Sequence, residues 1–219
     1  MMLNVEQARF NMIEQQIRPC DISDERVLDL LKHIRREHFV PSDMKQMAFV
    51  DMEIPLGYGE KMWRPELEAR VLQEMRLSSN DVVLEVGTGS GYLTALISAL
   101  AGRVTSVEIV PQLNAVASQN LAAVRRDNIT LEVGDASHGW GGDTKYDAII
   151  LTGSTPVLPE EFQNRLNVGG RLFAIVGDAP LMHAKVITCI APNTFETISI
   201  LETSVAPLQH AQQPIRFKF

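Results

Sequence analysis

The segment from Val82 to Tyr92 constrains the fold more than any other part of the chain. It opens with a short apolar run, Val82–Val86, in which β-branched residues dominate, and such a run is typical of a buried strand. Glycines then recur at alternate positions, and the apolar stretch Tyr92–Leu100 predicts a helix packed on a sheet. A strand, a glycine-rich turn and a helix in this order predict an α/β fold with a ligand site at the turn. Glycine allows the backbone to bend sharply and allows a ligand to approach the backbone closely.

The order of these glycines separates two kinds of ligand. Dinucleotide-binding folds use G-x-G-x-x-G, which seats a pyrophosphate on a helix N-terminus. Here the order is G-x-G-x-G, and Glu85 stands two residues before the first glycine, where a carboxylate would repel a pyrophosphate. The pattern therefore favours a ligand that carries an ammonium group and no phosphate, such as S-adenosylmethionine, over the nicotinamide cofactor of a dehydrogenase.

Later segments end in residues that suit the same ligand. A strand predicted at Val104–Val107 ends in Glu108, about 20 residues beyond the glycines, where folds of this type place the acid that holds a ribose diol. A third predicted strand ends at Gly134–Ala136, and a fourth covers Tyr146–Gly153. Ligands of open α/β sheets bind outside the carboxyl ends of the strands. The sequence thus predicts a cofactor site made of Glu85, Gly87, Thr88, Gly89, Gly91, Glu108, Ile109, Asp135 and Ala136.

The remaining segments predict helices before this core and strands at the end of the chain. The expected helices are residues 1–19 ended by Pro19, Ser23–Ile34 capped by Asp21 or Ser23, a short one near Met44–Ala48, Glu66–Met75, Pro111–Val124 and Pro159–Leu166. Loops or turns are expected at Ile54–Gly59 and Asn167–Gly170, and strands at Arg171–Val176, Ala184–Ile190 and Thr194–Ser204. Together these predict a doubly wound, Rossmann-like α/β sheet with an N-terminal helical extension and C-terminal antiparallel strands.

Composition narrows the possible partners. A chain of 219 residues, 45% hydrophobic and 21% charged, suits one α/β domain with an appendage. Its net charge of −7 argues against nucleic acid or anionic membrane as a partner. Cys20 and Cys189 form neither a disulfide framework nor a zinc spacing, and no signal peptide or membrane-spanning run is evident. The sequence therefore predicts a cytoplasmic protein and gives no indication of its oligomeric state.

Motifs spread over nearly the whole chain resemble those of one family. They are Gln15–Ile17, Asp24–Leu28, Glu37–Pro41, Ala48–Asp51, Ile54–Gly59, Leu84–Tyr92, Gly134–Asp135, Leu158–Pro159, Leu166–Gly170 and Val205–Leu208. With these motifs the chain resembles the protein-L-isoaspartate O-methyltransferases. The resemblance implies methylation, by S-adenosylmethionine and without a metal, of isoaspartyl carboxyl groups in damaged proteins or peptides. It also implies an N-terminal helical segment with an acceptor loop in residues 1–76, joined in one compact unit to a methyltransferase core in residues 77–219.

One segment departs from the family pattern. After Gly-Tyr-Gly the family carries Gln-Thr-Ile-Ser-Gln-Pro, whereas this chain has Glu60–Pro65, with Lys61 in the Thr place, Trp63 in the Ser place and Arg64 in the second Gln place. Two interpretations are open. These residues are either neutral substitutions in a surface loop, or they form a different acceptor site. In the second case Arg64 would grip a carboxylate or phosphate and Trp63 would stack on a flat acceptor, so that isoaspartyl activity is altered or replaced by binding of S-adenosylmethionine alone.

Overall fold

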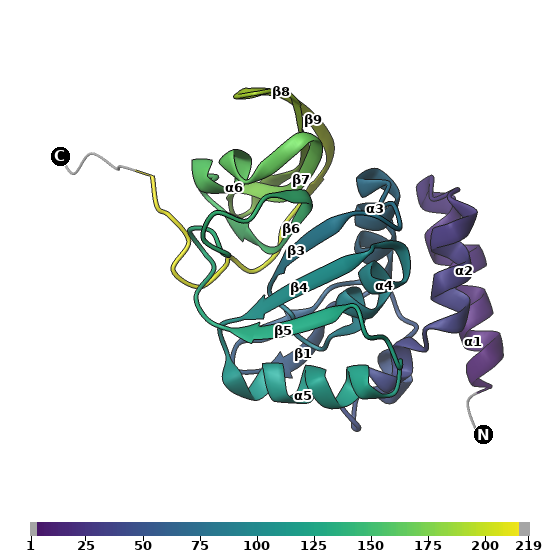
Figure 1. The fold of residues 1–219 in the computed structure, drawn as a ribbon. Coiled ribbons are helices and arrows are strands. Elements are labelled where there is room, and N and C mark those ends of the chain that lie inside the picture. The colour runs from purple at the N-terminus through teal and green to yellow at the C-terminus, as the bar shows by residue number, and fades with distance from the viewer. Residues whose placement is uncertain (1–3, 215–219) are drawn as a thin grey trace.

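A mixed seven-stranded sheet forms the centre of the molecule, as the computed structural model of residues 4–214 shows (Figure 1). Its strands lie in the order β5-β4-β3-β6-β7-β8-β9. Their bounds are β3 Val82–Val86, β4 Arg103–Glu108, β5 Ile129–Val133, β6 Tyr146–Thr155, β7 Leu166–Asp178, β8 Leu181–Ala191 and β9 Thr194–Thr203. Strands β3 to β7 pair in parallel, and β8 and β9 add an antiparallel hairpin. The predicted sheet and its C-terminal antiparallel strands are confirmed.

Helices cover the two faces of the sheet unequally. The helices are α1 Val5–Met12, α2 Glu25–His33, α3 Pro65–Met75, α4 Tyr92–Leu100, α5 Pro111–Ala122 and the short α6 Glu160–Asn164. The larger core cluster joins apolar residues of α1 to α5 to one face of the sheet, whereas Phe162 of α6 and residues of the connecting loops pack on the other. In Figure 1, α1 and α2 stand outside α3 and α4, as an N-terminal helical extension should.

Strand β3 shows why this sheet must lie inside the molecule. Val83 and Leu84 point to opposite faces, yet both are buried, because one joins the larger cluster and the other the smaller. A strand that is covered on both faces reads as a continuous apolar run rather than as an alternating one. The run that identified this strand in the sequence is thus a direct consequence of its central place in the sheet.

Several boundaries at the N-terminus differ from the prediction. Pro19 does not end the first helix, because α1 passes through a π-helical segment, Ile13–Ile17, into a 3-10 turn, Arg18–Cys20, that contains this proline. Helix α2 is capped by neither Asp21 nor Ser23. Asp24 is its N-cap, and its side chain accepts a hydrogen bond from the backbone N–H of Arg26 at 2.9 Å. Further 3-10 turns follow at Arg36–His38 and Lys45–Met47.

The segment predicted as a loop at Ile54–Gly59 is instead the first half of a β-hairpin. Strand β1, Ile54–Gly57, pairs antiparallel with β2, Glu60–Met62. Ile54 and Met62 are partners in this register and are both buried, so the hairpin is fixed to the core by its base. Of the glycines that suggested a loop, Gly57 ends β1 and Gly59 lies in the turn, and both have positive φ. The hairpin brings residues 54–62 to the edge of the cleft described below.

Two predictions near the other end of the sheet were also wrong in detail. The expected turn at Asn167–Gly170 lies inside β7, where the pairing with β6 is irregular between Tyr146 and Ala148. The helix expected from Pro159 to Leu166 is shorter, because Pro159 is its N-cap and the chain leaves the helix after Asn164. Neither difference changes the strand order.

Candidate cofactor and acceptor cleft

A cleft opens at the carboxyl ends of β3, β4, β5 and β6. The parts of its lining that follow these strands are Gly87–Ser90 after β3, Glu108 and Ile109 after β4, Gly134–Ser137 after β5, and Thr152 and Gly153 in β6. Parallel strands bring their carboxyl ends to one edge, which is why segments from four separate parts of the sequence meet here. Nine of the predicted site residues are in this lining: Lys61, Trp63, Gly87, Thr88, Gly89, Glu108, Ile109, Asp135 and Ala136.

The glycine-rich turn is held by an acid from the neighbouring strand. Glu108 is 3% exposed, and its carboxylate accepts hydrogen bonds from the backbone N–H of Gly89 at 2.8 Å and of Val110 at 3.0 Å. Burial raises the pKa of Glu108, while these two N–H donors act in the opposite direction. Gly89 has a φ of +54°, and a Cβ there would lie 3.2 Å from Leu56 of the hairpin. A side chain at this position would therefore crowd the cleft.

Asp135 lies on the exposed side of the cleft and is ionised. It accepts hydrogen bonds from the backbone N–H of Ser137 at 3.0 Å and shares one with Nδ1 of His210 at 2.7 Å. Partial burial opposes ionisation, but the hydrogen bonds from Ser137 and His210 outweigh it and hold the pKa of Asp135 at about 2. The residue thus offers a permanent acceptor at the end of β5.

Three of the predicted site residues are not part of the cleft lining. Glu85 is fully buried behind the glycine turn, where its carboxylate accepts hydrogen bonds from Thr94 at 2.5 Å and Ser106 at 2.6 Å, and burial raises its pKa to about 7. Gly91 begins α4 with positive φ, facing Ala117 and Leu121 of α5. Arg64 instead lies beside Glu66, with Nε 3.3 Å from its carboxylate.

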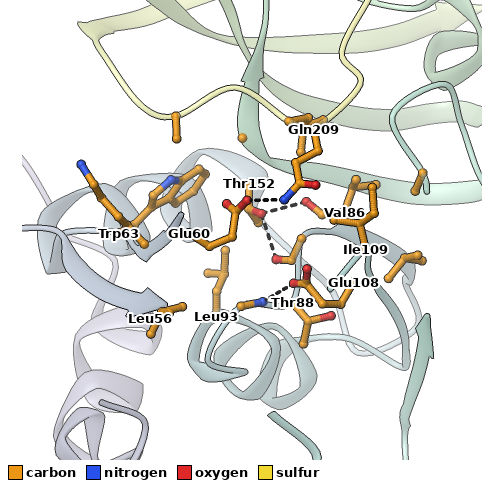
Figure 2. Close-up of a pocket in the computed structure, with 18 of the residues that line it drawn as sticks. Leu56, Glu60, Trp63, Val86, Thr88, Leu93, Glu108, Ile109, Thr152 and Gln209 are labelled. Carbon is orange, nitrogen blue, oxygen red and sulfur yellow. Dashed lines mark hydrogen bonds between the residues drawn. The ribbon is translucent and has the colours of Figure 1, made fainter. Parts of the chain in front are cut away.

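The second wall of the cleft was not predicted. This wall is formed by residues of the β1–β2 hairpin and the segment directly after it, among them Leu56, Glu60 and Trp63, and by residues 206–209 beyond β9. Figure 2 shows Glu60 between Trp63 and Gln209, and the amide of Gln209 donates a hydrogen bond to its carboxylate at 2.8 Å. Backbone hydrogen bonds of Ser154 with residues 206 and 208 tie this last segment to β6. The motif at Val205–Leu208 marked the segment, but nothing local in the sequence showed that it would form a wall.

Trp63 is a core residue as well as a cleft residue. It is 6% exposed, and its ring packs edge-on against Phe173 with centroids 6.1 Å apart. Its carbonyl accepts a hydrogen bond at 2.5 Å from Arg36, which also pairs with the buried Glu68 and lies over the Tyr92 ring. The interpretation of this segment as neutral surface substitutions is therefore wrong for Trp63. Lys61 is different, because its half-exposed ammonium pairs with Glu53 at 2.9 Å.

The side chains of the cleft fit S-adenosylmethionine. Apolar residues such as Leu56, Leu93 and Ile109 offer contact area for a ligand, and carboxylates face the cleft. In the glycine turn, the positions without a side chain allow a ligand to approach the backbone closely. No phosphate-binding arrangement of cations accompanies them, since Lys61 is the one basic side chain that residues 4–214 contribute to the lining.

Across the same residues no group of three or more His, Cys, Asp or Glu is placed to hold a metal ion. None of the helices described is long and apolar enough to cross a membrane.

Comparisons with known proteins agree with this assignment. Residues 7–209 match the sequence model of the protein-L-isoaspartate(D-aspartate) O-methyltransferase family. A protein-L-isoaspartate O-methyltransferase of Methanoculleus marisnigri is 40% identical over 169 residues, 77% of each chain. A protein-L-isoaspartate O-methyltransferase 1 of Pelobacter propionicus is 34% identical over 94% of this chain and 97% of its own.

A solved structure shares the fold. It is a putative protein-L-isoaspartate O-methyltransferase of Plasmodium falciparum, in complex with S-adenosyl-L-homocysteine. It matches with a TM-score of 0.79 at 18% identity, over 94% of this chain and 99% of its own. A second structure, named protein-L-isoaspartate O-methyltransferase, matches with a TM-score of 0.77 at 22% identity, over 93% of this chain and 65% of its own.

Proposed function

Since this chain belongs to the protein-L-isoaspartate O-methyltransferase family and is an S-adenosylmethionine-dependent methyltransferase, we propose that it methylates a side-chain carboxylate of a protein or peptide, with isoaspartyl groups as the acceptor. The observation that carries this proposal is the two-walled cleft. One wall holds the strand-end residues suited to the cofactor, and the other, made of the hairpin and residues 206–209, faces it across a space open to solvent. The acceptor enters between them.

The residues of the chain bind the cofactor and the acceptor and orient them relative to each other. They do not have to transfer a proton. S-adenosylmethionine, when bound, supplies a methyl group made electrophilic by its sulfonium. We expect Glu108 and Asp135, which line the cleft, to hold polar groups of the cofactor, and the backbone at Gly87 and Gly89 to allow the cofactor to approach closely. A carboxylate acceptor is already anionic at neutral pH, so alignment in line with the methyl group and exclusion of water are sufficient.

A second candidate is a related methyltransferase with a different acceptor. The observation in its favour is that residues 60–64 contribute Trp63 and Lys61 to the cleft, where the family pattern has hydroxyl-bearing residues. An indole offers one donor and no acceptor, so it cannot replace a small hydroxyl that both donates and accepts. A polar group of the acceptor that is left without its hydrogen-bond partner in the cleft costs about 1–3 kcal/mol. This second candidate predicts weak turnover of simple isoaspartyl peptides with retained cofactor binding.

Methyl transfer from labelled S-adenosylmethionine distinguishes the two candidates. The substrates are an isoaspartyl peptide and the same peptide with ordinary aspartate, and cofactor affinity is measured separately by calorimetry. Turnover of the isoaspartyl peptide alone, at an ordinary enzyme rate of about 1–10³ s⁻¹, supports the first candidate. Cofactor binding without turnover supports the second. Failure to bind S-adenosylmethionine contradicts both.

A further inference from the structure

The acidic lining of the cleft is only partly neutralised. Five carboxyl side chains line it within residues 4–214, namely Glu53, Glu60, Glu68, Glu108 and Asp135. Two of them pair with a cation, Glu53 with Lys61 at 2.9 Å and Glu68 with the buried Arg36, and Asp135 shares a hydrogen bond with the imidazole of His210 at 2.7 Å. The other two have neutral partners, which leaves their charge uncompensated.

Glu60 and Glu108 are these two uncompensated acids. Glu60 accepts a hydrogen bond from the amide of Gln209, and Glu108 accepts bonds from the backbone N–H groups of Gly89 and Val110. In the described part of the chain neither forms an ion pair with a lysine, arginine or histidine. They face the same cleft from opposite walls, and the charge of Glu60 contributes to raising the pKa of Glu108. A cation bound in this cleft relieves that repulsion.

The substrate and product forms of the cofactor differ in their net charge. S-adenosylmethionine carries a sulfonium and an ammonium against one carboxylate, so its net charge is +1. S-adenosylhomocysteine, the product, has lost the sulfonium charge and is neutral overall. An uncompensated carboxylate in a cleft partly shielded from solvent therefore stabilises the substrate form relative to the product form.

We propose that Glu60 is a specificity-determining residue of the methyltransferase site, which favours the binding of sulfonium-bearing S-adenosylmethionine over its neutral product. Glu60 lies beside the half-exposed Lys61, whose ammonium pairs with Glu53 and not with Glu60, so the charge of Glu60 stays available to a bound cation. The consequence is a higher ratio of S-adenosylmethionine affinity to product affinity, and hence weaker product inhibition than a neutral residue at this position would give. The inference concerns the cofactor and is independent of the acceptor.

The substitution Glu60→Gln tests this proposal with little change of shape. Glutamine keeps an oxygen that can accept the hydrogen bond from Gln209, so only the charge is removed. We expect calorimetry to show S-adenosylmethionine binding weakened by about fivefold or more, with S-adenosylhomocysteine affinity changed less than about twofold. Retained product binding also shows that the variant is folded.

Two control variants separate charge from contact. Gln209→Ala removes the hydrogen bond and keeps the charge, so the ratio of the two affinities should stay close to that of the unaltered protein. Glu196→Gln removes one charge from an exposed position on β9, outside the cleft lining, and should leave both affinities unchanged. Equal weakening of both ligands by Glu60→Gln, or no change in either, overturns the proposal.

A measurement on the unaltered protein gives an independent check. Raising the ionic strength from about 0.05 M to about 0.5 M shortens the screening length and weakens interactions with exposed charges. Binding of S-adenosylmethionine should weaken more than binding of S-adenosylhomocysteine over this range. An identical salt dependence for the two ligands contradicts the proposed role of charge, whatever the variants show.

Discussion

Replacing Trp63 with serine, the small hydroxyl residue of the family pattern, is the change that the sequence alone would suggest for restoring a family-like acceptor site. The structure predicts that Trp63→Ser instead destabilises the protein. The indole is 6% exposed and belongs to the larger core cluster, and its ring contacts Phe173 edge-on. Truncation of a buried tryptophan costs about 3–5 kcal/mol through lost burial and the cavity left behind.

The assay is urea unfolding, followed by circular dichroism and fitted to a two-state transition. A loss of this size also lowers the melting temperature by about 6–20 °C for a chain of this length. The control is Lys61→Thr, since Lys61 is half exposed and its ion pair with Glu53 is worth no more than about 1 kcal/mol. Trp63→Phe, which keeps an aromatic ring against Phe173, should lose less stability than Trp63→Ser.

A Trp63→Ser variant within about 1 kcal/mol of the unaltered protein would refute this reasoning. It would mean that the indole contributes little to the core and that the cleft can accept a smaller residue at no cost. Reduced stability in Trp63→Ser, with Lys61→Thr unchanged, would show that Trp63 contributes to the core in addition to lining the cleft.

Two further predictions follow from the buried acids of the site. Glu108→Ala should weaken S-adenosylmethionine by about 1.5–3 kcal/mol, the scale of a hydrogen bond to a charged group, and unchanged affinity in calorimetry would show that Glu108 does not hold the cofactor. The second concerns Glu85, whose pKa is raised by burial from 4.5 to about 7, so its folded form takes up a proton more readily than its unfolded form. Its contribution to stability is therefore fully present below about pH 4.5 and is lost as the pH rises through about 7, which amounts to about 3 kcal/mol. Urea unfolding at pH 5 and pH 8 should show this loss in the unaltered protein and not in Glu85→Gln, and the same pH difference in both proteins would count against a raised pKa.

The half of the cleft at the strand ends could be predicted because its signals are local. Gly87 and Gly89 follow an apolar run, and Glu108 and Asp135 each follow a strand, so the rule that strand ends meet at one edge of the sheet was enough to group them. Glu85 was predicted on a different ground, its place two residues before the glycine turn, and it is not part of the cleft lining. An acid next to a glycine turn looks like a ligand contact in the sequence, whereas in the structure its side chain points away, into a pocket formed by Thr94 and Ser106.

The other half of the cleft depends on contacts between distant parts of the chain. Glu60 and Gln209 are 149 positions apart, and neither lies in a segment whose periodicity indicates its partner. Trp63 looked like a residue of an exposed loop because Pro and Gly surround it, yet its ring meets Phe173 of β7, more than one hundred residues away. Such pairings depend on the final packing of the chain, and a single sequence carries no local sign of them.

The hydrogen bond between Glu60 and Gln209 also has a consequence for the order of events during synthesis. At about 5–20 residues per second, roughly 7–30 s pass between the addition of Glu60 and the addition of Gln209. During that interval the wall made by residues 206–209 is missing, although the strand-end residues from Gly87 to Gly153 have already been added. The side of the cleft suited to the cofactor can therefore form earlier than the side that completes the acceptor entrance.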